Sequence, residues 1–369
     1  MFIKKVLVGA GAVFLALLLL PMTAASANGG FNGGFFGHHG RYGFQTPGSA
    51  VVNLENGPYG PVLVVGGAGA GYVPATSTTP ASYAYPAGSS LYIASIDPPT
   101  YGASFFNEYQ AGCTTTVVSD TFEGPLSCTG SETDPEADWP ALTTAGYPVA
   151  GPGVNQRLLG AVWRTDLDAF QVTYAGHPLY LFDPGPNSFF GANFYETVLP
   201  IPPWHTAWYL LSPWGTPATG PASLGTEATQ AGTTYSSEVL AAAMLPNAIN
   251  PPPNPPPNGL PVSVYTFSGD GPGFSRCYGA CAREFIPLYT VGTPTSGTGV
   301  NTGAVGVIHR FDGTEQVTYD GHPLYLYNQE APLPNPAAPA GSPPIMTNGT
   351  TGNGQGVSAF GGTLSLVNP

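Results

Sequence analysis

Charged side chains are scarce in this sequence of 369 residues. They make up 8% of the chain, and 8 Lys and Arg stand against 21 Asp and Glu, which gives a net charge of −13. Typical soluble domains carry about 25% charged residues. A protein that binds nucleic acid or an anionic membrane surface needs basic residues to meet the phosphates. We therefore expect neither nucleic acid nor a membrane surface as a partner.

The shortage of ionisable groups also bears on pH. Stability depends on pH through groups that bind protons differently in the folded and unfolded states. A chain with few such groups has few such dependences, so one hypothesis is a protein that tolerates an acidic exterior. The alternative is an ordinary secreted protein rich in Gly, Thr and Pro.

Familiar catalytic motifs are missing as well. The sequence contains no GxSxG, HExxH or Walker loop, and no CxxC or CxxCH. These absences remove the motif-based arguments for nucleophilic hydrolysis, zinc proteolysis, nucleotide binding, thioredoxin-like chemistry and haem attachment. We predict a protein that is not an enzyme, with no catalytic residue and no cofactor.

Only the N-terminus carries a long apolar run. Val6–Leu20 is apolar over 15 residues, follows Lys4 and Lys5, and precedes the small residues Ala25-Ser26-Ala27. A spanning helix needs about 20 residues, so residues 1–27 are predicted to be a signal peptide cleaved after Ala27. The mature chain is then secreted or periplasmic and has no membrane span. Residues 28–49 are rich in Gly, Phe, Tyr and His, and are predicted to be a flexible tail.

One segment of twelve residues occurs twice in the sequence, and we call it the repeated segment. QVTYAGHPLYLF occupies residues 171–182 and QVTYDGHPLYLY occupies 316–327, with ten of twelve positions identical. Further matches precede and follow in the same order, such as SLYIASID at 90–97 and SVYTFSGD at 263–270. This order predicts a tandem duplication, with module A at 50–215, a linker at 216–232 and module B at 233–369.

The matched pieces are typical of β-strands. They are short, rich in β-branched and aromatic residues, and bounded by Gly or Pro. Ala175-Gly176 and Asp320-Gly321 predict tight hairpins within the repeated segment. The second strand of the first hairpin has two apolar faces, which places it between two layers. SSEVLAAAML at 236–245 is the best helix candidate. The predicted fold is mainly β: two copies of a small hairpin-based sheet, sandwich or barrel with long Gly/Pro loops.

The four cysteines fall two to a module. Cys113 and Cys128 lie in module A, and Cys277 and Cys281 lie in module B. An even count in an exported protein favours disulfides. A metal or redox site is the alternative.

Two histidines and two aspartates are the other candidates. His177 and His322 stand in Gly-His-Pro turns, where a ring can hold the backbone of the hairpin through a buried hydrogen bond. A metal-binding role is the weaker alternative and needs further ligands brought together by folding. Asp97 and Asp270 are expected to cap turns after their strands rather than to act as acids.

The chain resembles a bacterial family of secreted proteins and lipoproteins with a Tyr-x4-Asp repeat. The residues of the Tyr-x4-Asp motif are Tyr92 with Asp97 and Tyr265 with Asp270. The GHPLY parts of the repeated segment add His177 with Tyr180 and His322 with Tyr325. Module B also contains CYGACAREFIPL and NGQGVSAFGGTLSLV. The resemblance implies an extracytoplasmic, small β-rich module. It implies no activity, because the family's function is unknown.

This chain departs from that family pattern in three ways. No cysteine for lipidation follows the apolar run. The second motif runs from Tyr325 to Glu330 in module B, and module A lacks the matching acid. Module A also lacks the close cysteine pair.

Three classes of function remain. The first is a non-enzymatic binding or structural protein of the cell exterior, with cell-surface glycan or self-association as possible partners. The second is a periplasmic metal-binding or redox accessory protein. A hydrolase with carboxylate chemistry is the third.

Overall fold

The computed structural model describes fourteen stretches of the chain, which begin at residue 49: 49–66, 69–71, 83–85, 87–100, 109–116, 118–120, 124–126, 128–129, 139–182, 194–196, 206–227, 238–246, 260–330 and 352–369. The predicted signal peptide, the tail up to residue 48 and the proline runs at 250–258 and 331–344 lie outside them.

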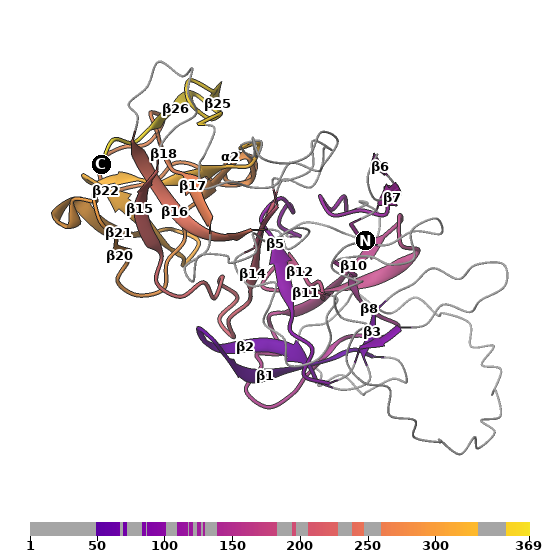
Figure 1. Cartoon of the computed structure of the whole chain (residues 1–369). Helices are drawn as coiled ribbons and strands as arrows, with labels where there is room; N and C mark the ends of the chain where they lie inside the picture. The colour runs from indigo at the N-terminus through magenta and orange to yellow at the C-terminus, as the bar shows by residue number, and fades with distance from the viewer. Residues whose placement is uncertain are drawn as a thin grey trace, which may run out of the picture.

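The fold is mainly β, as predicted. Figure 1 shows two lobes, one built from the indigo and magenta N-terminal part and one from the orange and yellow C-terminal part. We call residues 49–211 the N-terminal half and residues 222–369 the C-terminal half. Within the described stretches no helix has the length and apolar character that a membrane crossing requires.

Most sheets of the N-terminal half are small and antiparallel. The sheet orders are β2-β1-β9, β10-β11-β8-β3-β4 with β12 beside β11, and β6-β7. Their bounds are β1 (Val51–Gly57), β2 (Gly60–Val65), β3 (Gly69–Gly71), β4 (Tyr83–Tyr85), β6 (Val118–Asp120), β7 (Gly124–Leu126), β8 (Leu142–Thr144), β9 (Val149–Ala150), β10 (Leu159–Arg164), β11 (Ala169–Tyr174) and β12 (His177–Pro178).

Among the described residues, two sheets lie wholly within the C-terminal half, with orders β19-β24-β18-β26-β25 and β21-β22-β23. Their strands and the two short helices are β18 (Tyr265–Phe267), α2 (Ala280–Glu284), β19 (Phe285–Pro287), the 3₁₀ helix η2 (Thr302–Ala304), β21 (Val305–His309), β22 (Glu315–Tyr319), β23 (His322–Pro323), β24 (Tyr325–Tyr327), β25 (Ser358–Ala359) and β26 (Gly362–Leu366).

A seven-stranded sheet joins the halves. Its order is β20-β15-β16-β13-β14-β5, with β17 beside β16. The strands are β5 (Tyr92–Ala94), β13 (Phe194–Glu196), β14 (Thr206–Leu210), β15 (Ser223–Glu227), β16 (Val239–Pro246), β17 (Leu260–Ser263) and β20 (Thr295–Ser296). The connection is the parallel pairing of β13 with β16. The halves are therefore parts of one hydrogen-bonded structure.

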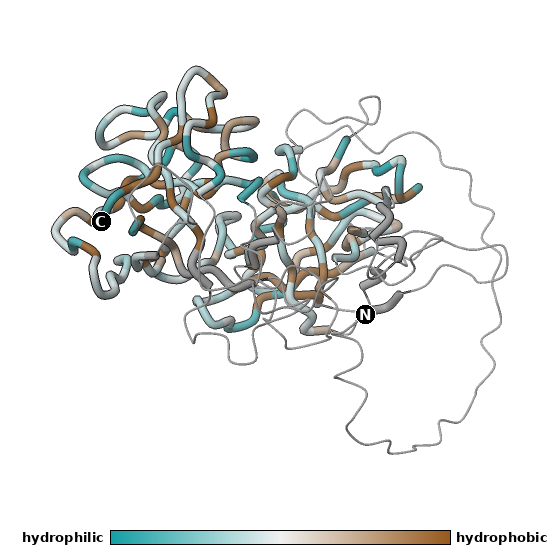
Figure 2. Tube along the Cα trace, turned by 45° about the horizontal axis from the view of Figure 1, so that its top comes forward, coloured by the Kyte–Doolittle hydropathy of each residue, from teal (hydrophilic) through white to brown (hydrophobic). Residues whose placement is uncertain are grey.

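The residues that the structure describes form three hydrophobic cores. A central core takes side chains from both halves, among them Leu63, Leu179, Leu240 and Leu324. An N-terminal outer core surrounds Trp139 and takes its residues from the N-terminal half and from Ala218 just after it. A C-terminal outer core surrounds Phe285 and takes its residues from the C-terminal half. In Figure 2 apolar segments run through the interior of the coloured tube, and hydrophilic segments gather in its outer loops. The burial of apolar area in the shared core binds the halves together.

Both copies of the repeated segment form β-hairpins, as predicted. Tyr174 pairs with His177 and Tyr319 pairs with His322. Both central residues of each turn have positive φ: 50° and 81° at Ala175 and Gly176, and 47° and 75° at Asp320 and Gly321. Those angles define a type I′ turn, whose twist matches that of the strands.

The return strand of each hairpin lies between two cores, also as predicted. Leu179 and Leu181 belong to the central core, while Tyr180 and Phe182 face the N-terminal outer core. The C-terminal half repeats this alternation, because Leu324 and Leu326 face the central core and Tyr325 and Tyr327 the other.

One prediction about secondary structure is wrong. The helix candidate at 236–245 overlaps strand β16, which pairs with β15 and β17. Its alanines favour a helix locally, but two flanking strands and a buried setting outweigh that weak preference.

The predicted linker at 216–232 contains strand β15, which lies between β16 and β20. This segment is part of a sheet and not only a connection. The division of the chain into two modules at the predicted boundaries stays a prediction.

Candidate functional site

A buried arginine links several segments of the C-terminal half. Arg310 directly follows β21, and its side chain has no exposed surface. Its Nη1 donates to Gln316 Oε1 at 2.7 Å and to Ser275 Oγ at 2.9 Å, and its Nη2 donates to the Cys277 carbonyl at 2.7 Å. Nε lies 3.3 Å from the Asp312 carboxylate. A buried charge is tolerable only when paired and hydrogen-bonded, and all three nitrogens of this guanidinium have partners.

The N-terminal half contains the same arrangement. Arg164 at the end of β10 is equally buried, and it donates to Gln171 at 2.6 Å and to the Cys113 carbonyl at 2.8 Å. Two further bonds of 2.7 Å reach the Asp166 carboxylate. In both halves the arginine ties a β-hairpin to a disulfide-bonded loop.

The glutamine of each cluster orients the hairpin. Gln171 and Gln316 are the first residues of the two copies of the repeated segment, and each is completely buried. Besides accepting from arginine, Gln171 Nε2 donates to the Leu179 carbonyl at 2.9 Å and Gln316 Nε2 donates to the Leu324 carbonyl at 2.7 Å. The amide therefore links the two strands of its hairpin to the buried charge.

The tyrosines and acids of the Tyr-x4-acid motifs exchange partners. Tyr265 and Tyr325 are opposite each other in β18 and β24. The Tyr325 hydroxyl donates to Asp270 at 2.5 Å, and the Tyr265 hydroxyl donates to Glu330. Each tyrosine thus bonds the acid that follows the other tyrosine.

Each acid also accepts a hydrogen bond from the backbone of a loop. Asp270 Oδ1 accepts the Arg276 N–H at 2.7 Å, and Glu330 Oε1 accepts the Gly352 N–H at 2.7 Å. The motif therefore fixes two strands and two loops with four side chains.

The N-terminal half keeps the tyrosine and the acid of one motif near each other. Tyr92 and Tyr180 form a bridge, and Tyr180 acts to lower the pKa of Asp97, whose Oδ2 is buried without a hydrogen-bond partner among the described residues. Asp97 Oδ1 accepts the Gly112 N–H at 2.7 Å. The position that matches Glu330 is Gly185, which lies outside the described residues.

Burial dominates the protonation of these groups. It raises the pKa of Asp97 and of Asp270, while Tyr180 beside Asp97, the hydrogen bond from Tyr325 to Asp270 and the nearby arginine charges act in the opposite direction. Burial also raises the pKa of Tyr325, so the phenol keeps its proton and acts as donor.

Both cysteine pairs form disulfides within their own half, as predicted. Cys113 and Cys128 have Cα atoms 5.3 Å apart, and Cys277 and Cys281 have Cα atoms 5.1 Å apart. The first pair lies in the N-terminal outer core and the second in the C-terminal one.

The two histidines differ in their surroundings. His177 is partly buried, and burial lowers its pKa against the opposing charge of Asp312 from the other half. His322 is exposed, and its imidazole has no hydrogen-bond partner among the described residues, although its backbone pairs with Tyr319. The expected buried hydrogen bond at His322 is therefore wrong, because the turn is held by its backbone angles instead.

The arrangement as a whole is one of structural support. No three or more His, Cys, Asp or Glu side chains of the described stretches gather closely enough to hold a metal ion. The buried arginines, glutamines and tyrosines are hydrogen-bonded to one another and to backbone groups, and this fixes strands and loops in place.

Several central residues were not expected from the sequence: Arg164, Gln171, Arg310, Gln316 and, as a partner of Tyr265, Glu330. A signal existed, because an arginine precedes the repeated glutamine by seven residues in one copy and six in the other. No known protein family, curated protein or solved structure matches this chain.

Proposed function

We propose that this chain is an exported, non-enzymatic binding or structural protein of the cell exterior. The observation that carries the proposal is the closure of the two arginine clusters. Arg164 and Arg310 have no exposed side-chain surface, and their donors meet groups of their own half. Catalytic groups need a face open to substrate, so these clusters favour a role in holding the scaffold.

The disulfides support an extracytoplasmic location. Cys113–Cys128 and Cys277–Cys281 use all four cysteines of the chain. Such bonds persist in oxidising compartments and are rare in the cytosol. The apolar N-terminal run supports export on independent grounds.

The surface offers aromatic side chains for binding. Trp214 is 73% exposed and Phe311 is 94% exposed. Large aromatics are favoured as anchors in binding surfaces. Cell-surface glycan and a second copy of the chain are the partners to test first, by co-sedimentation with cell-wall polysaccharide and by sedimentation velocity, each with Trp214→Ala and Phe311→Ala as variants.

Fractionation and elemental analysis test the proposal. We expect the mature chain outside the cytoplasm, beginning at Asn28, with no stoichiometric metal. Retention of Met1–Ala27 in the cytoplasm would overturn the location. One metal ion per chain, lost in His177→Ala or His322→Ala, would put the periplasmic metal-binding or redox accessory protein in its place.

A further inference from the structure

One loop follows the same path in both halves. Residues 144–164 and 290–310 have the same length, and the backbone hydrogen bonds made from them coincide position by position. Examples are Val149 N–H to Ala50 O with Thr295 N–H to Ala222 O, Gly151 N–H to Val52 O with Gly297 N–H to Leu224 O, and Leu158 N–H to Asn155 O with Ala304 N–H to Asn301 O. Side chains at matching positions can therefore be compared directly.

In the N-terminal half, two polar side chains bridge this loop. The Tyr147 hydroxyl donates to the Leu159 carbonyl of β10 at 2.9 Å. The Gln156 carboxamide accepts the Ala150 N–H at 2.8 Å and donates to the Pro148 carbonyl at 3.0 Å. A phenol and an amide thus meet three backbone groups there.

Beside them lies an aromatic pair. The rings of Trp163 and Phe170 meet edge to face with centroids 5.0 Å apart. The N-terminal half therefore covers this part of β10 and β11 with its own aromatic side chains.

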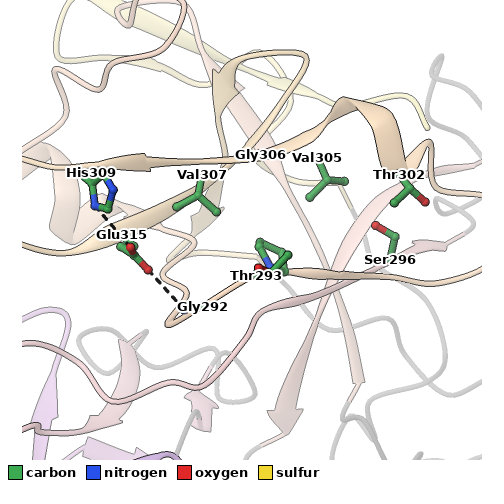
Figure 3. A pocket seen from close by; sticks show the side chains of 10 residues that line it. Gly292, Thr293, Ser296, Thr302, Val305, Gly306, Val307, His309 and Glu315 are labelled. Atoms are coloured by element: carbon green, nitrogen blue, oxygen red, sulfur yellow. Dashed lines mark hydrogen bonds and ion pairs between the residues drawn. The ribbon is translucent and has the colours of Figure 1, made fainter.

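In the C-terminal half, the same place is hollow. The matching residues are Thr293 for Tyr147 and Thr302 for Gln156, and both line a hollow of about 340 Å³. Figure 3 shows Thr293 and Thr302 together with Val305 and Ser296 around it.

The rim of the hollow is polar. His309 and Glu315 take the places of the aromatic pair and face each other at 3.4 Å. The Ser296 hydroxyl oxygen is buried and has no hydrogen-bond partner among the described residues. A buried polar atom of this kind calls for a partner.

We propose that this hollow binds a tyrosine side chain of an extended polypeptide. The N-terminal half shows the chemistry that fits: a phenol donating to the carbonyl at the position of Val305, and an amide beside the position of Ser296. A peptide carries both groups, because its backbone amide has the same donor and acceptor as the Gln156 carboxamide. The inference rests on the proposed binding function and names its ligand class.

The test is a titration of purified full-length protein with N-acetyltyrosinamide, followed by calorimetry. We expect one site with Kd in roughly the millimolar range, as befits a ligand of this size. N-acetylphenylalaninamide should bind about 5-fold more weakly, because it lacks the phenolic hydrogen bond. Absence of saturable binding, or equal affinity for the two probes, overturns the proposal.

Two reciprocal variants locate the site. Thr293→Tyr with Thr302→Gln gives the C-terminal half the side chains of the N-terminal one, and should weaken binding at least 10-fold without lowering Tm. Tyr147→Thr with Gln156→Thr should open a second hollow and raise the stoichiometry from one to two. Probe binding that is unchanged in the first variant also overturns the proposal.

If the first variant fails to fold, the ratio of the two probes on the wild-type protein still decides. The proposed function is judged separately by location and metal content. A chain that is exported and free of metal but indifferent to the tyrosine probe retains the proposed function and loses this site.

Discussion

At the scale of single residues, two arginines occupy places usually reserved for apolar side chains. Arg310 donates to four separate groups from within the protein. The planar guanidinium can reach partners on three sides, whereas a lysine ammonium is one compact point charge. The cluster thus depends on the shape of the arginine as well as on its charge.

Arg310→Lys should therefore destabilise the protein by about 3 kcal/mol, since it leaves buried acceptors without donors. Urea unfolding followed by tryptophan fluorescence measures this. Arg164→Lys should behave in the same way, and Arg157→Lys, at an exposed position, is the matched control with little effect. Equal stability of all three variants would contradict a supporting role for the clusters.

Asp270→Asn tests the protonation of the motif acid. Burial raises the folded pKa of Asp270 above its ordinary 3.8. The folded state therefore binds the proton more tightly, and this contribution to stability is complete below the unfolded pKa and lost as pH rises through the folded pKa. The wild type should gain stability relative to Asp270→Asn as pH is lowered from 7 to 4. Denaturant titrations across that range measure the difference, and the opposite slope would show that hydrogen bonds to the carboxylate outweigh its burial.

At the scale of elements, the two hairpins differ in one turn residue. Asp320 tolerates positive φ because its short polar side chain can bond locally, but Ala175 at φ 50° has no such compensation. The N-terminal hairpin is therefore the more strained of the two.

Ala175→Asn should stabilise the protein by about 0.5–1 kcal/mol, because asparagine adopts the left-handed region readily. Thermal unfolding would show a higher Tm. Asp320→Ala is the mirror experiment and should lower Tm by a similar amount. A lower Tm for Ala175→Asn would mean that contacts of the methyl group matter more than the backbone angle.

These hairpins also show what the sequence can predict. Their turn chemistry and apolar alternation are local, so residues 171–182 and 316–327 were sufficient to predict them. Strand β16 was mistaken for a helix because its alanines carry only a weak preference, and its partners β15 and β17 decide its state. The arginine clusters join residues such as Cys277 and Arg310, 33 positions apart. No local pattern specifies such a contact.

At the scale of the whole molecule, the central core makes the halves depend on each other. Leu240 in the C-terminal half and Leu63 in the N-terminal half belong to the same cluster. Tyr209 and Tyr289, one from each half, meet edge to face at 5.6 Å. Separation of the halves would expose this shared apolar surface to water.

The protein should therefore unfold in one transition. Leu240→Ala removes a fully buried side chain from the central core and should cost about 2–5 kcal/mol. In calorimetry the whole transition should move to lower temperature, with van't Hoff and calorimetric enthalpies in agreement. Two transitions, of which Leu240→Ala moves only one, would favour independent modules.

Acid titration tests the whole set of ionisable groups. Asp97 and Asp270, with raised pKa values, add stability as pH falls, whereas His177, with a lowered pKa, loses its contribution as pH falls below about 6.5 through the folded pKa. With few other groups to titrate, the fold should persist at pH 3 by circular dichroism. Unfolding between pH 4 and 3 would contradict the expected acid tolerance.

The exchange of partners between the two Tyr-x4-acid motifs also governs how the chain can change over evolutionary time. Tyr265 donates a hydrogen bond to Glu330, and Tyr325 donates one to Asp270. Each motif therefore depends on a residue of the other motif. Among descendants of this sequence, a change at 265 should be accompanied by a change at 330, and a change at 325 by a change at 270. If one motif were moved into another protein without the other, its acid would lack the tyrosine hydroxyl that donates to it.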